Sequence, residues 1–150
     1  MPRIFHLSKF DEQFLDKSFY WLNDPIIQKS IDGVALDKED QLKWFNTLEN
    51  RTDYKIWGLT CDNAPIGVVG LRHITSDDAE FFCYVGEKDY WGGCGRPIME
   101  LAEQEAKQMN LKSLWLRVLF DNPRAKAVYD HMNYSQYNKD DKFYFMRKYL

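Results

Sequence analysis

The chain has 150 residues, of which 45% are hydrophobic and 16% aromatic, and its formal net charge is −3. This length suits one domain with a substantial core, so we expect residues 1–150 to form a single domain. The basic residues form no run, which argues against a protein that binds nucleic acid by neutralising its phosphates.

Cys61, Cys83 and Cys94 form no CxxC pair and the three histidines stand apart, so we expect no disulfide framework and no metal site. No apolar run is long enough to span a membrane, and the first ten residues lack the apolar core of a signal peptide. We therefore expect a cytoplasmic protein, monomeric or homodimeric, without a membrane partner.

The first part of the chain is typical of a strand followed by two helices. RIFHLS (3–8) predicts the strand, and FDEQFLDKSFYWL (10–22) has apolar residues at helical spacing. Asn-Asp-Pro at 23–25 ends this helix, because the residue before a proline avoids the helical region. Asp37 is a good N-cap, so the second helix runs from there to about residue 49.

Three β-rich runs follow: DYKIWGLTC (53–61), IGVVGLRHI (66–74) and AEFFCYV (79–85). The connections DNAP (62–65) and TSDD (75–78) are short and turn-like. The three strands are therefore expected to be antiparallel neighbours.

The remainder predicts a helix, a strand, a second helix and two closing strands. The strand–helix–strand run over 79–119 implies a parallel pair in the centre of the sheet, where a ligand crevice is expected. The fold class is therefore α/β (α+β), with a mixed, mostly antiparallel sheet in the order β-α-α-β-β-β-α-β-α-β-β. The expected ranges are 97–110 and 123–132 for the helices, and 113–119, about 134–138 and 142–149 for the strands.

A glycine-rich loop, YWGGCGRPIM (90–99), precedes the first of these two helices. Glycines remove side chains that would keep an anion away, and the free N–H groups of a helix's first turn carry roughly +0.5 charge. A phosphate could bind there, but the loop could also be a tight turn without a ligand. A dinucleotide fingerprint is disfavoured because Ile98 replaces its third glycine, and a Walker loop is excluded because no Gly-Lys-Ser/Thr follows.

The stretch CYVGEKDYWGGCGRPIM (83–99) resembles the coenzyme A signature of the GNAT family of N-acetyltransferases, Q/R-x-x-G-x-G/A after a strand. Gly93 and Gly95 supply its two glycines, while Tyr90 stands where the family has Gln or Arg. The resemblance implies an N-acetyltransferase that takes acetyl-CoA as cosubstrate and uses no metal. It also implies that the central parallel strands splay apart to hold the coenzyme.

A second element of the family is an asparagine at the start of the next helix with a tyrosine seven residues on, and DNPRAKAVYDHMNY (121–134) contains both. By this resemblance Tyr129 would protonate the departing thiolate, although a packing role is the alternative. Asn122 would contact the pantetheine or order a water, or would only cap the helix.

The resemblance also assigns the donor contacts. Pantetheine would lie beside residues 81–85, and a backbone N–H near Val85 would polarise the thioester carbonyl. Arg96, Arg124 and Lys126 could reach the phosphates or could simply be solvated. The residues expected to bind the cosubstrate are Tyr84, Val85, Trp91, Gly92, Gly93, Cys94, Gly95, Arg96 and Asn122.

An incoming amine must lose a proton before it attacks, so a general base is useful. Glu80 is the first candidate because it lies on the strand leading to the thioester, but it could instead face water or pair with Arg72. Glu87 or a water relay could replace it. Cys83 and Cys94 lack a histidine in an obvious arrangement and are interpreted as bystanders.

Residues 21–37 would shape the acceptor pocket, with Trp21 and Asn23 as candidate substrate contacts. Their W-x-N-x-P pattern resembles the branch that contains acetyltransferases of ribosomal-protein amino termini and of bacterial nucleotide-linked amino sugars. A small-molecule amine such as an amino sugar is the expected acceptor; a protein amino terminus, or a coenzyme A-binding domain without turnover, are the alternatives. The candidate aromatic walls are Trp21, Trp44, Tyr84 and Trp91.

Overall fold

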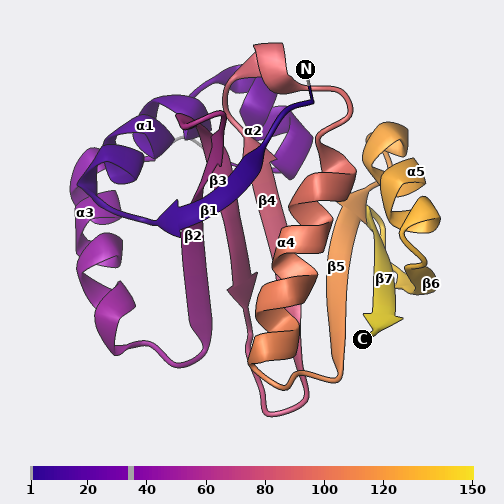
Figure 1. Ribbon diagram of the computed structural model, residues 1–150. Helices are drawn as coiled ribbons and strands as arrows, with labels where there is room; N and C mark the ends of the chain where they lie inside the picture. Colours follow the sequence, from indigo (N-terminus) through magenta and orange to yellow (C-terminus); the bar gives the residue numbers. More distant parts are fainter. Residues whose placement is uncertain (1, 34–35) are drawn as a thin grey trace.

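The computed structural model describes residues 2–33 and 36–150, which contain a seven-stranded sheet in the order β1-β2-β3-β4-β5-β7-β6 (Figure 1). Neighbouring strands are antiparallel except for β4 and β5, which are parallel. The predicted mixed sheet with a central parallel pair is therefore confirmed. The strands are β1 (Phe5–Lys9), β2 (Tyr54–Cys61), β3 (Ala64–Arg72), β4 (Asp78–Val85), β5 (Ser113–Leu119), β6 (Ser135–Lys139) and β7 (Phe143–Tyr149).

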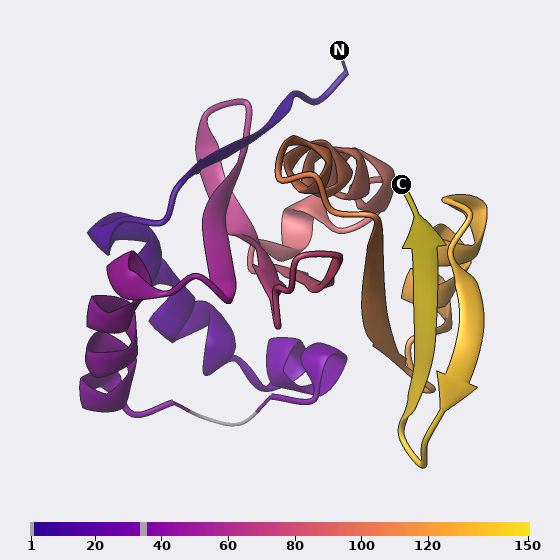
Figure 2. The same cartoon turned by 90° about the horizontal axis from the view of Figure 1, so that it is seen from below.

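Helices cover both faces of the sheet, as Figure 2 shows. One face packs against α1, α2 and α3, and the other against α4 and α5. None of the helices in the described ranges is both long and apolar enough to cross a membrane. The helices are α1 (Glu12–Leu22), α2 (Pro25–Ile31), α3 (Lys38–Thr47), α4 (Gly95–Gln108) and α5 (Pro123–His131), with short 3₁₀ turns at Leu48–Asn50 and Lys88–Tyr90.

Helix α2 was not predicted, because the sequence indicated only two helices between the first two strands. The first helix does end at Leu22, but the chain enters another helix three residues later. Asp24 caps it by accepting a hydrogen bond from the Ile26 N–H at 2.9 Å, and Pro25 occupies its first turn. Proline suits that position because the first N–H groups of a helix have no intrahelical partner.

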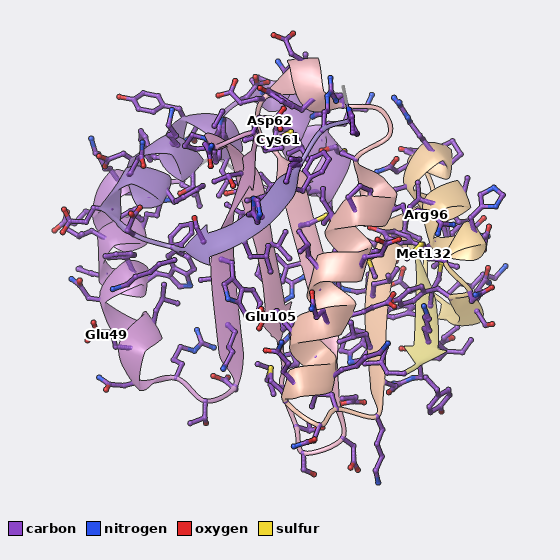
Figure 3. All side chains as sticks on the ribbon, in the orientation of Figure 1. Glu49, Cys61, Asp62, Arg96, Glu105 and Met132 are labelled. Atoms are coloured by element: carbon purple, nitrogen blue, oxygen red, sulfur yellow. The ribbon has the colours of Figure 1, made fainter. Side chains whose placement is uncertain are left out.

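The predicted β2–β3 turn is a two-residue hairpin, since both Asp62 and Asn63 have positive φ angles. The Asp62 carboxylate also accepts a hydrogen bond from the Ile4 N–H at 3.0 Å, beside the start of β1 (Figure 3). One turn therefore fixes the register of the β2–β3 pair and anchors the first strand.

Alternate residues of β4 face opposite sides of the sheet. Phe82 and Tyr84 pack with the cluster that includes α1, whereas Phe81, Cys83 and Val85 pack with the cluster that includes α4. The two faces of the sheet thus present different side chains of the same strand.

Strands β4 and β5 pair over only three residues, with Asp78–Glu80 opposite Ser113–Trp115. Beyond Trp115, β5 continues beside β7 up to Leu119. In the part of the chain that the structure describes, residues 81–85 therefore have no strand partner on the β5 side. The centre of the sheet splays open at this point.

Candidate active site

A cavity of about 560 Å³ opens where β4 and β5 separate. Phe82 and Tyr84 line it from the α1–α3 side, and Cys83 and Val85 line it from the α4–α5 side. The cavity therefore connects the two faces of the sheet through the splay. A donor entering from one face and an acceptor entering from the other could meet inside it.

The exposed edge of β4 presents backbone hydrogen-bonding groups to this cavity. The Gly86 N–H donates to the Ile66 carbonyl on β3 at 2.7 Å. Since these groups alternate in an antiparallel pair, the N–H groups of Val85 and Cys83 point the other way, into the splay. The Val85 carbonyl already accepts a hydrogen bond from the Trp91 indole at 2.8 Å, so its N–H is the group left for a ligand.

The predicted glycine loop has the backbone that its sequence requires. Gly92 and Gly93 have φ angles of +99° and +75°, which L side chains rarely adopt. A Cβ at Gly93 would meet nothing within 4 Å, so the loop is open on that side, whereas a Cβ at Gly95 would lie 2.8 Å from the Val128 side chain. Two glycines thus shape the loop, and the third lets α4 approach α5.

Helix α4 starts at Gly95, and the side chain of its N-cap residue, Cys94, makes no hydrogen bond to the first N–H groups. Such uncapped groups form an anion site, particularly beside a loop that lacks side chains. Trp91, Gly92, Gly93, Cys94 and Gly95 all line the cavity.

Among the basic residues predicted to reach phosphates, Arg124 lines the cavity, with its guanidinium beside Gly92. Arg96, labelled in Figure 3, is exposed and lies 3.7 Å from Glu100 on the next turn of its helix. Lys126 is paired with Asp130 at 3.2 Å. The structure therefore brings only Arg124 of these three residues to the cavity lining.

Tyr129 and Asn122 both line the cavity. Burial, together with Cys83 and Cys94, raises the pKa of the Tyr129 phenol, so the hydroxyl stays protonated at neutral pH. The Asn122 side chain accepts a hydrogen bond from the Ala125 N–H at 3.3 Å, so it caps α5 while facing the cavity. The sequence offered these two roles for Asn122 as alternatives.

Glu80 lies in the cavity wall and is only 1% exposed. Its carboxylate accepts two hydrogen bonds from Arg72, at 3.1 and 3.0 Å, and one from the Arg117 Nε at 3.0 Å. His73 Nε2 lies 3.5 Å away. The pairing with Arg72 considered from the sequence is present, and both oxygens of the carboxylate accept hydrogen bonds from arginine.

Trp21 and Asn23 are not among the residues that line the cavity. The Trp21 indole donates to the Glu87 carboxylate at 3.2 Å. Asn23 bridges backbone groups, donating to the Phe19 carbonyl at 2.7 Å and accepting from the Leu36 N–H at 2.9 Å. Trp21 therefore ties α1 to the loop after β4, and Asn23 ties the end of α1 to the segment before α3.

Of the four aromatic residues predicted to form walls of the pocket, two line the cavity and two do not. Tyr84 and Trp91 line the cavity. Trp44 instead packs edge-on against Phe10, with ring centroids 5.8 Å apart, and Trp21 is 7% exposed and packs against Tyr84.

Sequence reasoning missed several residues that line the cavity. Ser30 and Ile31 belong to α2, which was not predicted, and Phe143 belongs to the last strand. Arg117 could have been found, because it is the single charge in the apolar strand SLWLRVL.

Cys83 lies in the cavity, where burial raises the pKa of its thiol to about 12. A thiol with this pKa carries almost no thiolate at neutral pH and is a weak nucleophile. This supports its interpretation as a bystander. In the described residues, no group of three or more His, Cys, Asp or Glu side chains could hold a metal ion.

A family model and a curated relative that match this chain are both acetyltransferases. Residues 5–135 match the acetyltransferase (GNAT) domain family. Acetyltransferase PseH of Campylobacter jejuni is 25% identical over 145 residues, covering 96% of this chain and 91% of that protein.

Two solved structures share the fold. The C. jejuni N-acetyltransferase PseH in complex with acetyl coenzyme A superposes with a TM-score of 0.77 at 22% identity, covering 98% of this chain and 99% of that one. The spermidine N-acetyltransferase of Vibrio cholerae, in complex with CoA and spermine, gives a TM-score of 0.86 at 18% identity, covering 97% and 95%.

Proposed function

Since the chain belongs to the acetyltransferase (GNAT) family, we propose that it transfers acetyl directly to the primary amine of a small molecule, and that this molecule is a nucleotide-linked amino sugar. The chain is an N-acetyltransferase with acetyl-CoA as its donor. One observation carries the proposal: a single cavity joins the uncapped start of α4 to Tyr129 and opens through the splay onto the other face of the sheet.

The residues on the α4–α5 side fit coenzyme A. The open loop at Gly92 and Gly93 and the first N–H groups of α4 would hold its pyrophosphate, and Arg124 would add a positive charge. The unpartnered edge of β4 would accept the pantetheine arm as an extra strand does.

Acetyl-CoA supplies the thioester from which the acetyl group is taken. The Val85 N–H points into the splay and would donate a hydrogen bond to the thioester carbonyl, where negative charge develops during attack. The Tyr129 hydroxyl would give its proton to the departing sulfur. Asn122 would hold the pantetheine or an ordered water beside it while capping α5.

The amine must lose a proton before it attacks, and a carboxylate of the cavity is not the group to which we assign this step. Glu80 is the carboxylate among the described residues that line the cavity, but its oxygens are engaged by Arg72 and Arg117. We propose that water carries this proton away and that Glu80 acts mainly by holding the two arginines. The base role of Glu80 stays the alternative.

The α1–α3 side of the cavity suits a sugar better than a flexible chain. It is lined by Phe82, Tyr84 and Phe143, whose rings can stack on a sugar or a base, and by the two arginines. The AEFFCYV strand resembles that of acetyltransferases of nucleotide-linked amino sugars, which supports the same acceptor, whereas the W-x-N-x-P pattern is shared with acetyltransferases of ribosomal-protein amino termini.

The proposal is tested by measuring thiol release from acetyl-CoA with three acceptor classes: nucleotide-linked amino sugars, peptides with a free amino terminus, and spermidine. We expect the amino sugars to give the highest kcat/KM. Acetyl-CoA alone should stabilise the protein by about 2.7 kcal/mol at a hundredfold excess over Kd. Preference for peptides would replace the acceptor assignment, and stabilisation without turnover on any amine would indicate a coenzyme A-binding domain.

A further inference from the structure

The acceptor side of the cavity contains a cluster of three charged side chains from three strands: Arg72 on β3, Glu80 on β4 and Arg117 on β5. Arg72 contributes its Nε and Nη2 to Glu80, and Arg117 contributes its Nε. Two guanidinium groups therefore surround one carboxylate, and the cluster is net positive.

Three guanidinium nitrogens are left over from this arrangement. Within residues 2–33 and 36–150, Arg72 Nη1 and both terminal nitrogens of Arg117 make no hydrogen bond. Neither arginine is fully buried, since their side chains are 32% and 35% exposed, and both line the cavity. Their remaining donors are thus open to whatever occupies the cavity.

The guanidinium groups are also held in place before any ligand arrives. Arg72 lies over the Phe82 ring at 4.9 Å from its centroid, and Arg117 lies over the Phe143 ring at 5.1 Å. Stacking on one side and Glu80 on the other fix each group, so little further ordering is needed when a ligand binds.

We propose that this cluster, Arg72–Glu80–Arg117, binds an anionic oxygen group carried by the amine acceptor, a phosphate or a carboxylate. The planar fork of an arginine matches such groups with two parallel hydrogen bonds. Glu80 is then a positioning residue, because it acts on the acceptor through the arginines. This inference rests on the proposed acetyl transfer at the same cavity and specifies what kind of amine the cavity accepts.

Position along the strand separates the anionic group from the amine. The last β4–β5 pair joins Glu80 to Trp115. Arg117 comes two residues after this pair on β5, as Phe82 does on β4, and Phe82 lies three residues before Val85. At about 3.3 Å per residue this is roughly 10 Å along the strand. An amino sugar with a phosphate at the far side of its ring fits this separation better than an α-amino acid, whose amine and carboxylate share one carbon. A polyamine such as spermidine carries only positive charges, which the cluster repels.

The test compares ligands that differ in one charged group. Binding of glucose, glucose 6-phosphate and glucuronate is measured by calorimetry with coenzyme A saturating, so that the donor's phosphate site is filled. Glucose 6-phosphate should bind about tenfold or more tightly than glucose, the range expected for hydrogen bonds to charged groups. Glucuronate distinguishes a carboxylate site from a phosphate site.

Three variants locate the effect. Arg117→Gln should remove the preference for the anionic sugar, and Arg117→Lys should retain part of it because lysine keeps the charge without the fork. Arg51→Gln is the matched control. Like Arg117, Arg51 pairs with a carboxylate and lies over an aromatic ring, here those of Asp53 and Tyr54, but it does not line the cavity. A thermal shift with acetyl-CoA verifies that each variant is folded.

Equal binding of glucose and glucose 6-phosphate by the wild type would overturn the inference, as would a preference that Arg117→Gln leaves intact. Thiol release with glucosamine and glucosamine 6-phosphate separates this result from the proposed function. Acetylation of both at equal rates would keep the acetyltransferase and reject the anion site. Preferred binding of the anionic sugars without thiol release from any amine would keep the anion site and reject the proposed acetyl transfer.

Discussion

The α4–α5 side of the cavity, which we propose binds the donor, and the α1–α3 side, which we propose binds the acceptor, are built in different ways. On the donor side, the loop and the first turn of α4 present backbone N–H groups within a single stretch, residues 91–96. On the acceptor side, side chains from α2, β3, β4, β5 and β7 converge from distant parts of the chain. Binding through the backbone depends on local glycine geometry, whereas binding through side chains depends on how the strands are assembled.

The largest expected effect is on the donor side. Gly93→Val places a β-branched residue at a φ angle of +75°, where its Cβ would meet nothing within 4 Å, so the fold should survive while the loop is strained and crowded. We expect the thermal shift with acetyl-CoA to disappear and kcat/KM to fall about a hundredfold, equivalent to about 2.7 kcal/mol.

A matched variant controls for strain. Asn110 also has a positive φ angle, 62°, but lies at the far end of α4. Asn110→Val should lower Tm and leave kcat/KM unchanged. If both variants lose activity equally, the loop has no special role in binding the donor.

Tyr129→Phe tests the point where donor and acceptor meet. Loss of the hydroxyl should lower kcat by about a hundredfold, as expected for a general acid, while KM for acetyl-CoA stays within a few-fold. Tyr134→Phe is the control, because the Tyr134 hydroxyl donates to Glu103 in the core, 3.1 Å away, and should affect only stability. An unchanged kcat in Tyr129→Phe would remove the proton-donor role.

Glu80→Gln distinguishes a base from a positioning residue. If Glu80 holds Arg72 and Arg117, KM for an anionic acceptor should rise about tenfold and the pH dependence of kcat should keep its shape. If Glu80 is the base, kcat should fall and the acidic limb of the profile should be lost. Because Glu80 is buried and accepts hydrogen bonds from both arginines, Tm is expected to fall in either case.

The smallest effect is expected at Cys83. Its pKa of about 12 lies above its ordinary value of 9.0, so the folded protein holds its proton where the unfolded chain has lost it. This contribution to stability is present below about pH 9 and is lost as the pH rises toward 12. Cys83→Ala should therefore keep kcat within threefold and flatten the fall in unfolding free energy over that window. Detection of an acetylated Cys83 during turnover would contradict direct transfer.

The two sides also differ in how far the sequence predicts them. Gly92, Gly93 and Gly95 predict an open loop before α4, because their spacing is local and their conformational role is specific to glycine. Asn122 and Tyr129 lie on one helix, so their spacing also survives in the sequence.

The residues on the α1–α3 side of the cavity could not be predicted from local spacing. Arg72, Glu80 and Arg117 meet only because β4 pairs with β3 on one side and with β5 on the other. Trp21 and Asn23 have a conspicuous sequence pattern, yet the Trp21 indole bonds to the loop after β4, and the Asn23 amide bonds to backbone groups of α1 and of the segment before α3. Helix α2 is short, and its seven residues give little helical periodicity to detect.

The most direct test of the account is mass spectrometry of a reaction that contains the protein, acetyl-CoA and a nucleotide-linked amino sugar, with thiol release followed in parallel. The account predicts one acetyl group on the sugar's primary amine for each thiol released, and no acetylated protein along the way. Thiol release without an acetylated sugar, or a spermidine product formed in preference to it, would contradict the account.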